Sequence, residues 1–224
     1  MVNPNKTAII GLFDNSGSMS QFDTNEFAGS INDIIKEQCK LSKVLFYGAT
    51  FSDKFNLFAD GIDGNNVNIT TEDLRPSGMT SLIPAFARMI RTAGKKFSDM
   101  REEDRPGKVI FILLSDGEQT YNMLRNRETD DEPYEGPGAR FNLKQLVEEH
   151  ENVWKWEFMF MGTSFDSISV GASMGLKKSK CLNFATTDGG LKSAMRCVTK
   201  NMSKIQRNDY SGFDDVDRTE SMLG

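Results

Sequence analysis

Apolar runs alternate along the chain with segments whose apolar residues recur at helical spacing. The runs expected to form strands are 7–13, 43–51, 54–58, 108–115, 154–161 and 180–184. The segments expected to form helices are 22–41, 81–98, 141–151, a short stretch within 162–175, and 187–206. Strands that alternate with helices predict a three-layer α/β/α sandwich around a mainly parallel six-stranded sheet.

Two of the expected strands have an identifiable place in that sheet. Residues 108–115 are almost all apolar, which is typical of a central parallel strand covered by helices on both faces. Only Ser52 and Asp53 separate the runs 43–51 and 54–58, and a two-residue connection predicts a hairpin. The strand at 54–58 should therefore run antiparallel to its neighbour, at one edge of the sheet.

The remaining polar segments define the domain organisation. Residues 60–77 are rich in Asp, Asn and Gly and are expected to form a loop. A polar insertion at 119–140 has a length that is often functional, although an ordinary surface loop is the simpler alternative. We assign residues 1–206 to a single domain. Residues 207–224 form a polar, acidic C-terminal tail that is expected to be flexible.

Composition excludes several classes of function. The net charge of −5, without a basic stripe, argues against a nucleic-acid partner. Three cysteines without CxxC spacing argue against a disulfide framework or a zinc site. No apolar run has the length of a signal-peptide core or a membrane span, so we expect a cytoplasmic protein without a membrane partner. The oligomeric state is left open.

Two nearby tryptophans are expected to pack, with a binding role as the alternative, and His150 is expected to be a surface or boundary residue. His150 lies at the end of an expected helix, and the chain has no second His with which to build a zinc site. Trp154 and Trp156 alternate within the expected strand 154–161, so both should face the same side and pack against the fold.

Five oxygen-bearing side chains fall where strands end or helices begin. Asp14, Ser16 and Ser18 alternate on the loop after the first strand, Asp116 follows the most apolar strand, and Thr80 opens a helix. In open α/β sheets the functional crevice lies beyond the carboxyl ends of the strands, so these side chains are expected to converge there. Carboxylate and hydroxyl oxygens are the ligands that Mg²⁺ and Mn²⁺ prefer.

Such a ligand set has a chemical consequence. It fills most of an octahedron but carries only two negative charges, so the bound cation stays electrophilic. We therefore expect the cation to accept a carboxylate from a partner protein that presents Glu or Asp. The simpler alternative is that Asp14, Ser16 and Ser18 form a helix N-cap loop with self-bonded hydroxyls. Thr80 would then only cap its helix, and Asp116 and Gly117 would form an ordinary strand-end turn.

Three motif pieces resemble the metal-ion-dependent adhesion site of the von Willebrand factor type A (VWA) domain. They are Asp14-Asn15-Ser16-Gly17-Ser18, Gly78-Met79-Thr80-Ser81-Leu82 and Leu114-Ser115-Asp116-Gly117-Glu118. Their order and spacing are similar to the family pattern DxSxS…T…D, within residues 5–206. The resemblance implies a Rossmann-like VWA fold and a protein-binding module that depends on Mg²⁺ or Mn²⁺, not an enzyme. It also implies that the hydroxyls of Ser16, Ser18 and Thr80 contact the ion, and that Asp14 and Asp116 bind it directly or through water.

The residues beside these ligands are the expected contacts to a partner. They are Asn15, Met79, Gly117 and Glu118, of which Glu118 is expected to be a rim charge and not a sixth ligand. The insertion 119–140 leaves the same edge of the sheet as Asp116 and is expected to form part of the rim that selects the partner.

Two further segments have a weaker family likeness, and two other functions are possible for the site. Residues 161–168 and 183–190 resemble stand-alone intracellular VWA proteins of bacteria and bacteriophages. A Mg²⁺-dependent phosphohydrolase of the haloacid-dehalogenase kind also places an Asp after its first strand. Its usual acid/base is a second Asp two residues later, where this chain has Ser16, a poor general acid. A structural or assembly protein that uses the site for self-association is the other alternative.

Overall fold

One sheet organises the computed structural model, which describes residues 2–116, 119–163 and 167–223. Within these ranges six strands are formed, β1 (Asn3–Asp14), β2 (Lys43–Phe51), β3 (Phe55–Asp63), β4 (Pro106–Ser115), β5 (Glu157–Gly162) and β6 (Cys181–Asn183). Their order across the sheet is β3-β2-β1-β4-β5-β6. Only the β2–β3 pair is antiparallel, which confirms the predicted edge strand and the mainly parallel sheet.

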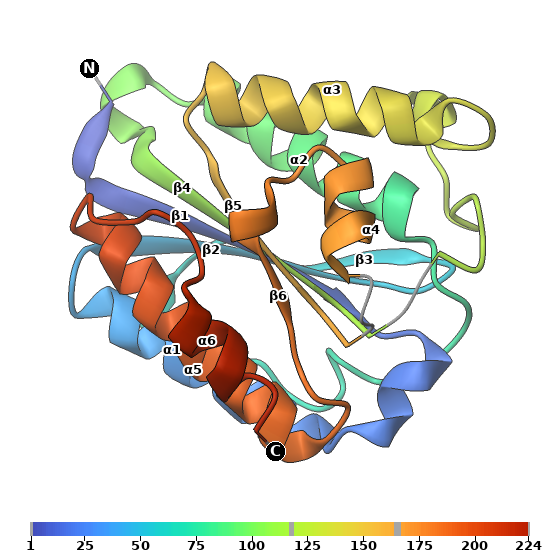
Figure 1. Cartoon of the computed structure of the whole chain (residues 1–224). Coiled ribbons are helices and arrows are strands. Elements are labelled where there is room, and N and C mark those ends of the chain that lie inside the picture. Colours follow the sequence, from blue (N-terminus) through green and yellow to red (C-terminus); the bar gives the residue numbers. More distant parts are fainter. Residues whose placement is uncertain (1, 117–118, 164–166, 224) are drawn as a thin grey trace.

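Helices cover both faces of the sheet (Figure 1). One layer holds α2 (Leu82–Asp99), α3 (Ala139–Asn152) and α4 (Ser167–Ser173), and the other holds α1 (Thr24–Cys39), α5 (Asp188–Gln206) and α6 (Asp215–Glu220). Short 3₁₀ helices at Gly17–Gln21, Gly64–Asn66, Glu102–Asp104, Thr129–Tyr134 and Lys178–Lys180 connect the main elements. The predicted three-layer sandwich is confirmed.

Strand β1 lies in the middle of the sheet and is apolar at successive positions. Ile10 and Leu12 of β1 pack into the core beneath α2 and α3, whereas Ile9 and Phe13 pack into the core above α1 and α5. A strand covered on both faces must bury consecutive side chains, because these alternate between the two faces.

The connections of β1 and β4 place a reversal of strand order at the strand ends where the crevice is expected. These two strands are paired, but the chain leaves β1 toward α1 on one face and leaves β4 toward α3 on the other. The strand order therefore reverses between them, which is where open α/β sheets bind ligands. Asp14 is the last residue of β1, and Asp116 directly follows β4.

The structure corrects two local predictions. β3 extends to Asp63, so the expected loop at 60–77 begins later. β5 begins at Glu157, after both tryptophans, and the expectation that they face the same side is wrong: Trp154 is 61% exposed and Trp156 only 4%. Lys155 between them has a positive φ of 58°, so the alternation of a strand does not apply there.

The C-terminal segment differs from the expected flexible acidic tail, because it folds back onto α5. Phe213 is buried in the core beside α5. Asp217 is fully buried and accepts hydrogen bonds from Lys200 Nζ at 2.9 Å and Asn201 Nδ2 at 2.8 Å. Asp214 and Asp217 form a capping box that starts α6, so these acidic side chains serve helix formation.

Asp214→Ala should lower the free energy of unfolding by about 1 kcal/mol, because the Asp217 N–H loses its cap. Asp214→Asn keeps an acceptor and should cost less. The Asp217 N–H is the main reason that the pKa of Asp214 falls from 3.8 to about 2. A depressed folded-state pKa gives stability that is complete above pH 3.8 and is lost as the pH falls toward about 2.

Urea unfolding followed by circular dichroism at pH 7 and pH 3 measures both effects. The difference between the wild type and Asp214→Asn should be smaller at pH 3. Asp215→Ala, in the first turn of the same helix, is the matched control. Equal stabilities for Asp214→Ala and Asp215→Ala would contradict the capping role.

Candidate metal centre

Two loops from distant parts of the sequence are joined around Asp14. The Asn15 N–H donates to Phe51 O at 2.9 Å, and the Ser77 N–H donates to Asn15 O at 2.7 Å. The Gly17 N–H donates to Gly78 O at 3.0 Å. The loop that carries Ser16 and Ser18 therefore lies directly against the loop that carries Thr80.

Hydroxyl groups connect the two candidate carboxylates. The Ser16 N–H donates to Asp14 Oδ1 at 2.8 Å, and Ser115 Oγ donates to Asp14 Oδ2 at 2.6 Å. The hydroxyls of Ser16 and Ser18 lie 3.1 Å apart, and Ser18 Oγ donates to Asp116 Oδ1 at 2.9 Å. A hydrogen-bonded network thus runs from Asp14 at the end of β1, through Ser16 and Ser18, to Asp116 after β4.

The backbone of Thr80 is fixed by the insertion that follows β4. Its N–H donates to Thr120 Oγ1, and its carbonyl accepts from the N–H groups of Thr120 and Tyr121, each at 3.0 Å. Within the described ranges the Thr80 hydroxyl makes no hydrogen bond, so the backbone determines where this residue sits.

Gly78 allows the Thr80 loop to approach its neighbours. Its φ of +77° is strained for any residue with a side chain, and a Cβ there would lie 2.6 Å from Asp53 Oδ1. Asp53 is in turn held by Arg125 of the insertion, with Nε 2.7 Å from Oδ2. The β2–β3 turn, the Thr80 loop and the insertion therefore form one assembly.

The electrostatics of Asp14 favour a cation. Burial raises its pKa to about 6, against the opposing effect of the hydrogen bonds from Ser115 and Ser16, and the charge of Asp116 raises it further. The ion pairs of the described chain include none between Lys or Arg and Asp14 or Asp116. A buried carboxylate without a counter-charge is costly, and a divalent ion would supply that charge. The donor set fits Mg²⁺ or Mn²⁺, since every group is a hard oxygen.

The structure thus brings four predicted ligands, Asp14, Ser16, Ser18 and Asp116, into one hydrogen-bonded network and places Thr80 on the adjoining loop. The predicted partner contacts are less uniform. Met79 is 40% exposed beside Thr80, whereas Asn15 is half-buried and donates through Nδ2 to Arg75 O at 3.0 Å. Gly117 and Glu118 lie outside the described residues.

Sequence reasoning missed the side chains that support the ligands. Ser115 holds Asp14, Thr120 holds Thr80, and Gln21 donates through Nε2 to Asp116 Oδ2 at 2.8 Å. Gln119 Oε1 accepts from the Ile83 N–H at the start of α2 at 2.7 Å. Ser115 stands next to Asp116 in the sequence, and this was the one local signal for any of them.

A second acidic cluster, formed by Cys197, Asp217 and Glu220, is a poor metal centre. Its central carboxylate already has Lys200 and Asn201 as partners. Burial raises the pKa of the Cys197 thiol to about 12, so the thiolate that binds metals is disfavoured.

Comparisons with known proteins show the fold. No family model matches the chain. Similar solved structures include the vWF domain of the type V pili tip protein Mfa5 from Porphyromonas gingivalis, which is 11% identical, with 94% of this chain and 98% of that chain covered and a TM-score of 0.59. The PilB minor pilin from Streptococcus sanguinis is 14% identical, with 93% and 63% covered and a TM-score of 0.60.

A von Willebrand factor type A structure from Catenulispora acidiphila is 14% identical, with 88% of this chain and 42% of that chain covered and a TM-score of 0.53. The chain therefore has a VWA-like α/β fold. It spans less than two thirds of the length of PilB and of the Catenulispora chain.

One curated protein is also similar in sequence. Multiple RNA-binding domain-containing protein 1 from Yarrowia lipolytica is 25% identical over 122 residues, which are 52% of this chain and 14% of that protein. In the part of the chain that the structure describes, no helix has the length and apolar character needed to span a membrane.

Proposed function

We propose that this protein is a metal-dependent protein-binding module. Asp14, Ser16, Ser18, Thr80 and Asp116 would hold Mg²⁺ or Mn²⁺, and the ion would attract a Glu or Asp side chain of a partner protein. The observation that carries the proposal is the buried Asp14 carboxylate, which is linked through Ser16 and Ser18 to Asp116 and is paired with no cationic side chain of the described chain.

The chemistry of the donors favours recognition over catalysis. Serine and threonine hydroxyls are neutral, so the protein would neutralise a divalent ion with only two carboxylates. The ion would supply the remaining positive charge to an acidic ligand. Other residues of the chain orient the two carboxylates that would hold the ion. Ser115 and the Ser16 N–H orient Asp14, and Gln21 orients Asp116.

The insertion 119–140 supports a role as partner-selecting rim. It contacts the site through Thr120, and Met123 O accepts a hydrogen bond from Ser81 Oγ at 2.7 Å. Arg125 donates through its N–H to Asp53 O at 2.7 Å. These contacts fix the insertion beside Thr80, so its outer surface would lie next to a partner bound at the metal.

Other assignments have less support. A phosphohydrolase would need an acid/base where this chain has Ser16, so a Mg²⁺-dependent phosphatase assay on the wild type should give no activity above that of Asp14→Asn. We do not propose RNA binding for this chain on the basis of its similarity to the Yarrowia protein. The match covers only 14% of that protein, and the net charge of this chain is −5. We also propose a cytoplasmic location, which the three free cysteines support because they suit a reducing compartment.

Titration of the protein into Mn²⁺, followed by the electron paramagnetic resonance signal of free Mn²⁺, tests the metal site. One ion should bind per chain, and added Mg²⁺ should displace it. Affinity capture from the native cell in Mg²⁺ and again in EDTA tests the partner. Mn²⁺ binding without EDTA-sensitive capture would refute partner recognition only, whereas absence of Mn²⁺ binding would refute the site itself.

A further inference from the structure

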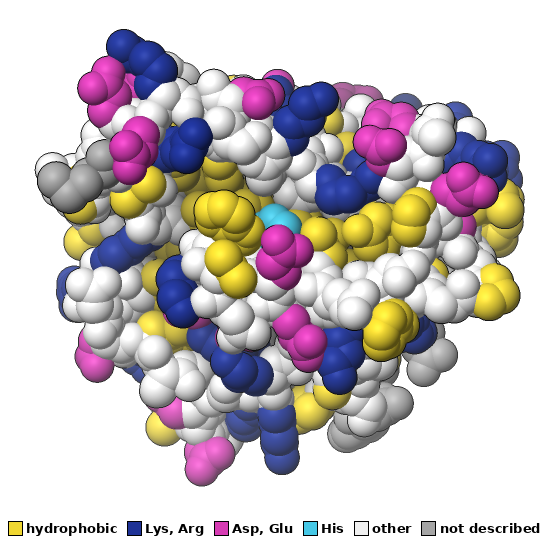
Figure 2. Space-filling model, turned by 90° about the horizontal axis from the view of Figure 1, so that it is seen from above, with side chains coloured by type: hydrophobic (Ala, Val, Ile, Leu, Met, Phe, Trp, Pro, Cys, Tyr) yellow, Lys and Arg dark blue, Asp and Glu magenta, His cyan; other side chains and the backbone are white. Residues whose placement is uncertain are grey.

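A second candidate site lies at the end of the sheet opposite Asp14 and Asp116. A cavity of about 300 Å³ opens between the C-terminal half of α2, the end of α3 and the residue that precedes β4. Its lining includes Gly94, Phe97, Arg105, His150, Trp154 and Trp156. Figure 2 shows hydrophobic side chains gathered around the single histidine on this face of the molecule.

Aromatic side chains form the walls of this cavity. The ring centroids of Phe97 and Trp156 are 5.7 Å apart, and those of His150 and Trp156 are 4.6 Å apart with an interplanar angle of 73°. His150 is fixed by its Nδ1–H, which donates to Leu146 O at 2.8 Å. Trp154 adds a fourth aromatic side chain and remains largely exposed, which is unusual for so large an apolar group.

Two unusual backbone positions lie beside the cavity. Gly94 lies inside α2, where glycine costs about 1 kcal/mol relative to alanine. A Cβ at this position would lie 3.3 Å from His150 Nε2, so the missing side chain leaves room in front of the imidazole. Lys155 adopts its positive φ between the two tryptophans, and such strain in a residue other than glycine is concentrated at functional sites.

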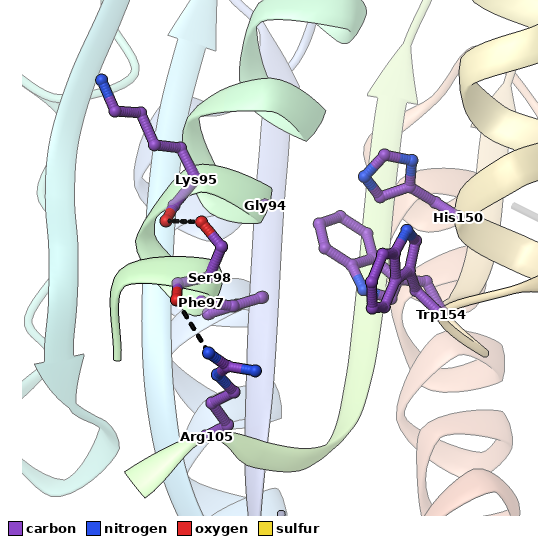
Figure 3. A pocket seen from close by; sticks show the side chains of 8 residues that line it. Gly94, Lys95, Phe97, Ser98, Arg105, His150 and Trp154 are labelled. Atoms are coloured by element: carbon purple, nitrogen blue, oxygen red, sulfur yellow. Dashed lines mark hydrogen bonds between the residues drawn. The ribbon is translucent and has the colours of Figure 1, made fainter. Parts of the chain in front are cut away.

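The charged side chains that line the cavity are Lys95 and Arg105, both cationic, whereas the negative charge of Glu149 acts on the His150 end. Arg105 donates through Nε to Met100 O at 3.1 Å and through Nη2 to Ser98 O at 2.8 Å. Both acceptors are neutral carbonyls, and across the described residues no carboxylate forms an ion pair with Arg105. Lys95 extends away from His150 and Trp154, whereas Arg105 lies beneath Phe97 (Figure 3). The fixed guanidinium is thus the cation that a ligand among the aromatic rings would meet.

We propose that this cavity binds a carboxylate attached to an aromatic body. The ring would pack over the Phe97–Trp156 pair and against the exposed Trp154, where aromatic pairs are favourable. The carboxylate would face Arg105, whose planar fork matches that group. A cavity of this size holds a small aromatic acid or the C-terminal aromatic residue of a peptide. Because the cavity and the metal centre lie at opposite ends of β4, this binding is independent of Mg²⁺.

Both tryptophans of the chain line the cavity, so intrinsic fluorescence reports on it directly. The full chain in EDTA is titrated with 3-phenylpropionate and with its amide, and then with acetyl-Gly-Gly-Phe as the free acid and as the C-terminal amide. Each acid should give a saturable change and bind about tenfold more tightly than its amide. The acid that binds more tightly identifies the kind of natural ligand: 3-phenylpropionate would indicate a small molecule, and the peptide acid would indicate a protein C-terminus.

Variants separate the charge from the aromatic walls. Arg105→Gln should abolish the preference for the acid and leave affinity for the amide unchanged. Trp154→Ala should weaken binding of both the acid and the amide, and calorimetry measures the affinities of this variant. Arg101→Gln, an exposed arginine outside the cavity, should behave as the wild type. Equal affinity of the wild type for acid and amide, no saturable change with either acid, or an acid preference that survives in Arg105→Gln would overturn the proposal.

Discussion

Asp14→Asn should lower the affinity for Mn²⁺ at least about 100-fold, since changes to groups that merely orient a ligand already cost about 10- to 100-fold. The substitution preserves the shape of a side chain that is almost completely buried. It removes the negative charge but keeps an oxygen that can accept the Ser16 N–H. Partner capture in Mg²⁺ should be lost together with metal binding.

Although Asp14→Asn loses metal affinity, its stability without metal should not fall. In EDTA, Asp14→Asn should be at least as stable as the wild type, because a buried carboxylate without a cation is replaced by a neutral amide. In excess Mg²⁺ the wild type should gain stability by ligand binding and the variant should not. Thermal unfolding with and without Mg²⁺ measures both effects.

Asp33→Asn, on the exposed face of α1, is the matched control for the loss of one negative charge. It should leave Mn²⁺ affinity unchanged. Retention of wild-type Mn²⁺ affinity by Asp14→Asn would show that the ion, if bound, is held elsewhere.

Asp131→Asn should lower the free energy of unfolding by about 3–5 kcal/mol, as expected when one partner of a buried ion pair is removed. Asp131 is fully buried and pairs with the Arg88 guanidinium, which is itself 5% exposed. Burial alone would raise the pKa of Asp131, but the Arg88 hydrogen bonds, the Glu128 N–H and the charges of Arg88 and Arg91 hold it below its usual value. The charge is therefore present at neutral pH.

This ion pair also anchors the insertion 119–140 to α2. Arg88 Nη2 donates to Asn126 O at 3.0 Å, and the Arg88 guanidinium lies 5.3 Å from the ring centroid of Phe55. Because the same insertion holds the backbone of Thr80, Asp131→Asn should weaken Mn²⁺ binding as well as the fold.

Urea unfolding and Mn²⁺ titration measure the two consequences. Asp130→Asn, the exposed neighbour of Asp131, is the control and should change neither quantity appreciably. The double variant Arg88→Met/Asp131→Leu should recover much of the lost stability, since well-packed apolar pairs often replace buried ion pairs without cost. A loss below about 1 kcal/mol in Asp131→Asn would contradict the anchoring role.

Local pattern was sufficient for several of the regular elements. The bounds of β2 agree with the predicted strand, and α2 and α5 agree with the predicted helices to within about one residue. The pattern failed for Trp154 and Trp156, because alternation predicts a common face only where the backbone is extended. It also gave no sign that Phe213 and Asp217 bury the C-terminal segment on α5, because their partners are supplied by another element.

The sequence by itself determined the fold class and the set of candidate ligands. Apolar periodicity encodes strands and helices, and Asp14, Ser16 and Ser18 are close enough in sequence to form a recognisable motif. Only the tertiary structure decided how the site is supported. Ser115 and Asp14 are 101 residues apart, Arg88 and Asp131 are 43 apart, and Thr80 and Thr120 are 40 apart. These contacts depend on which strands are neighbours and on how the loops cross the sheet edge, and local side-chain periodicity carries no record of either.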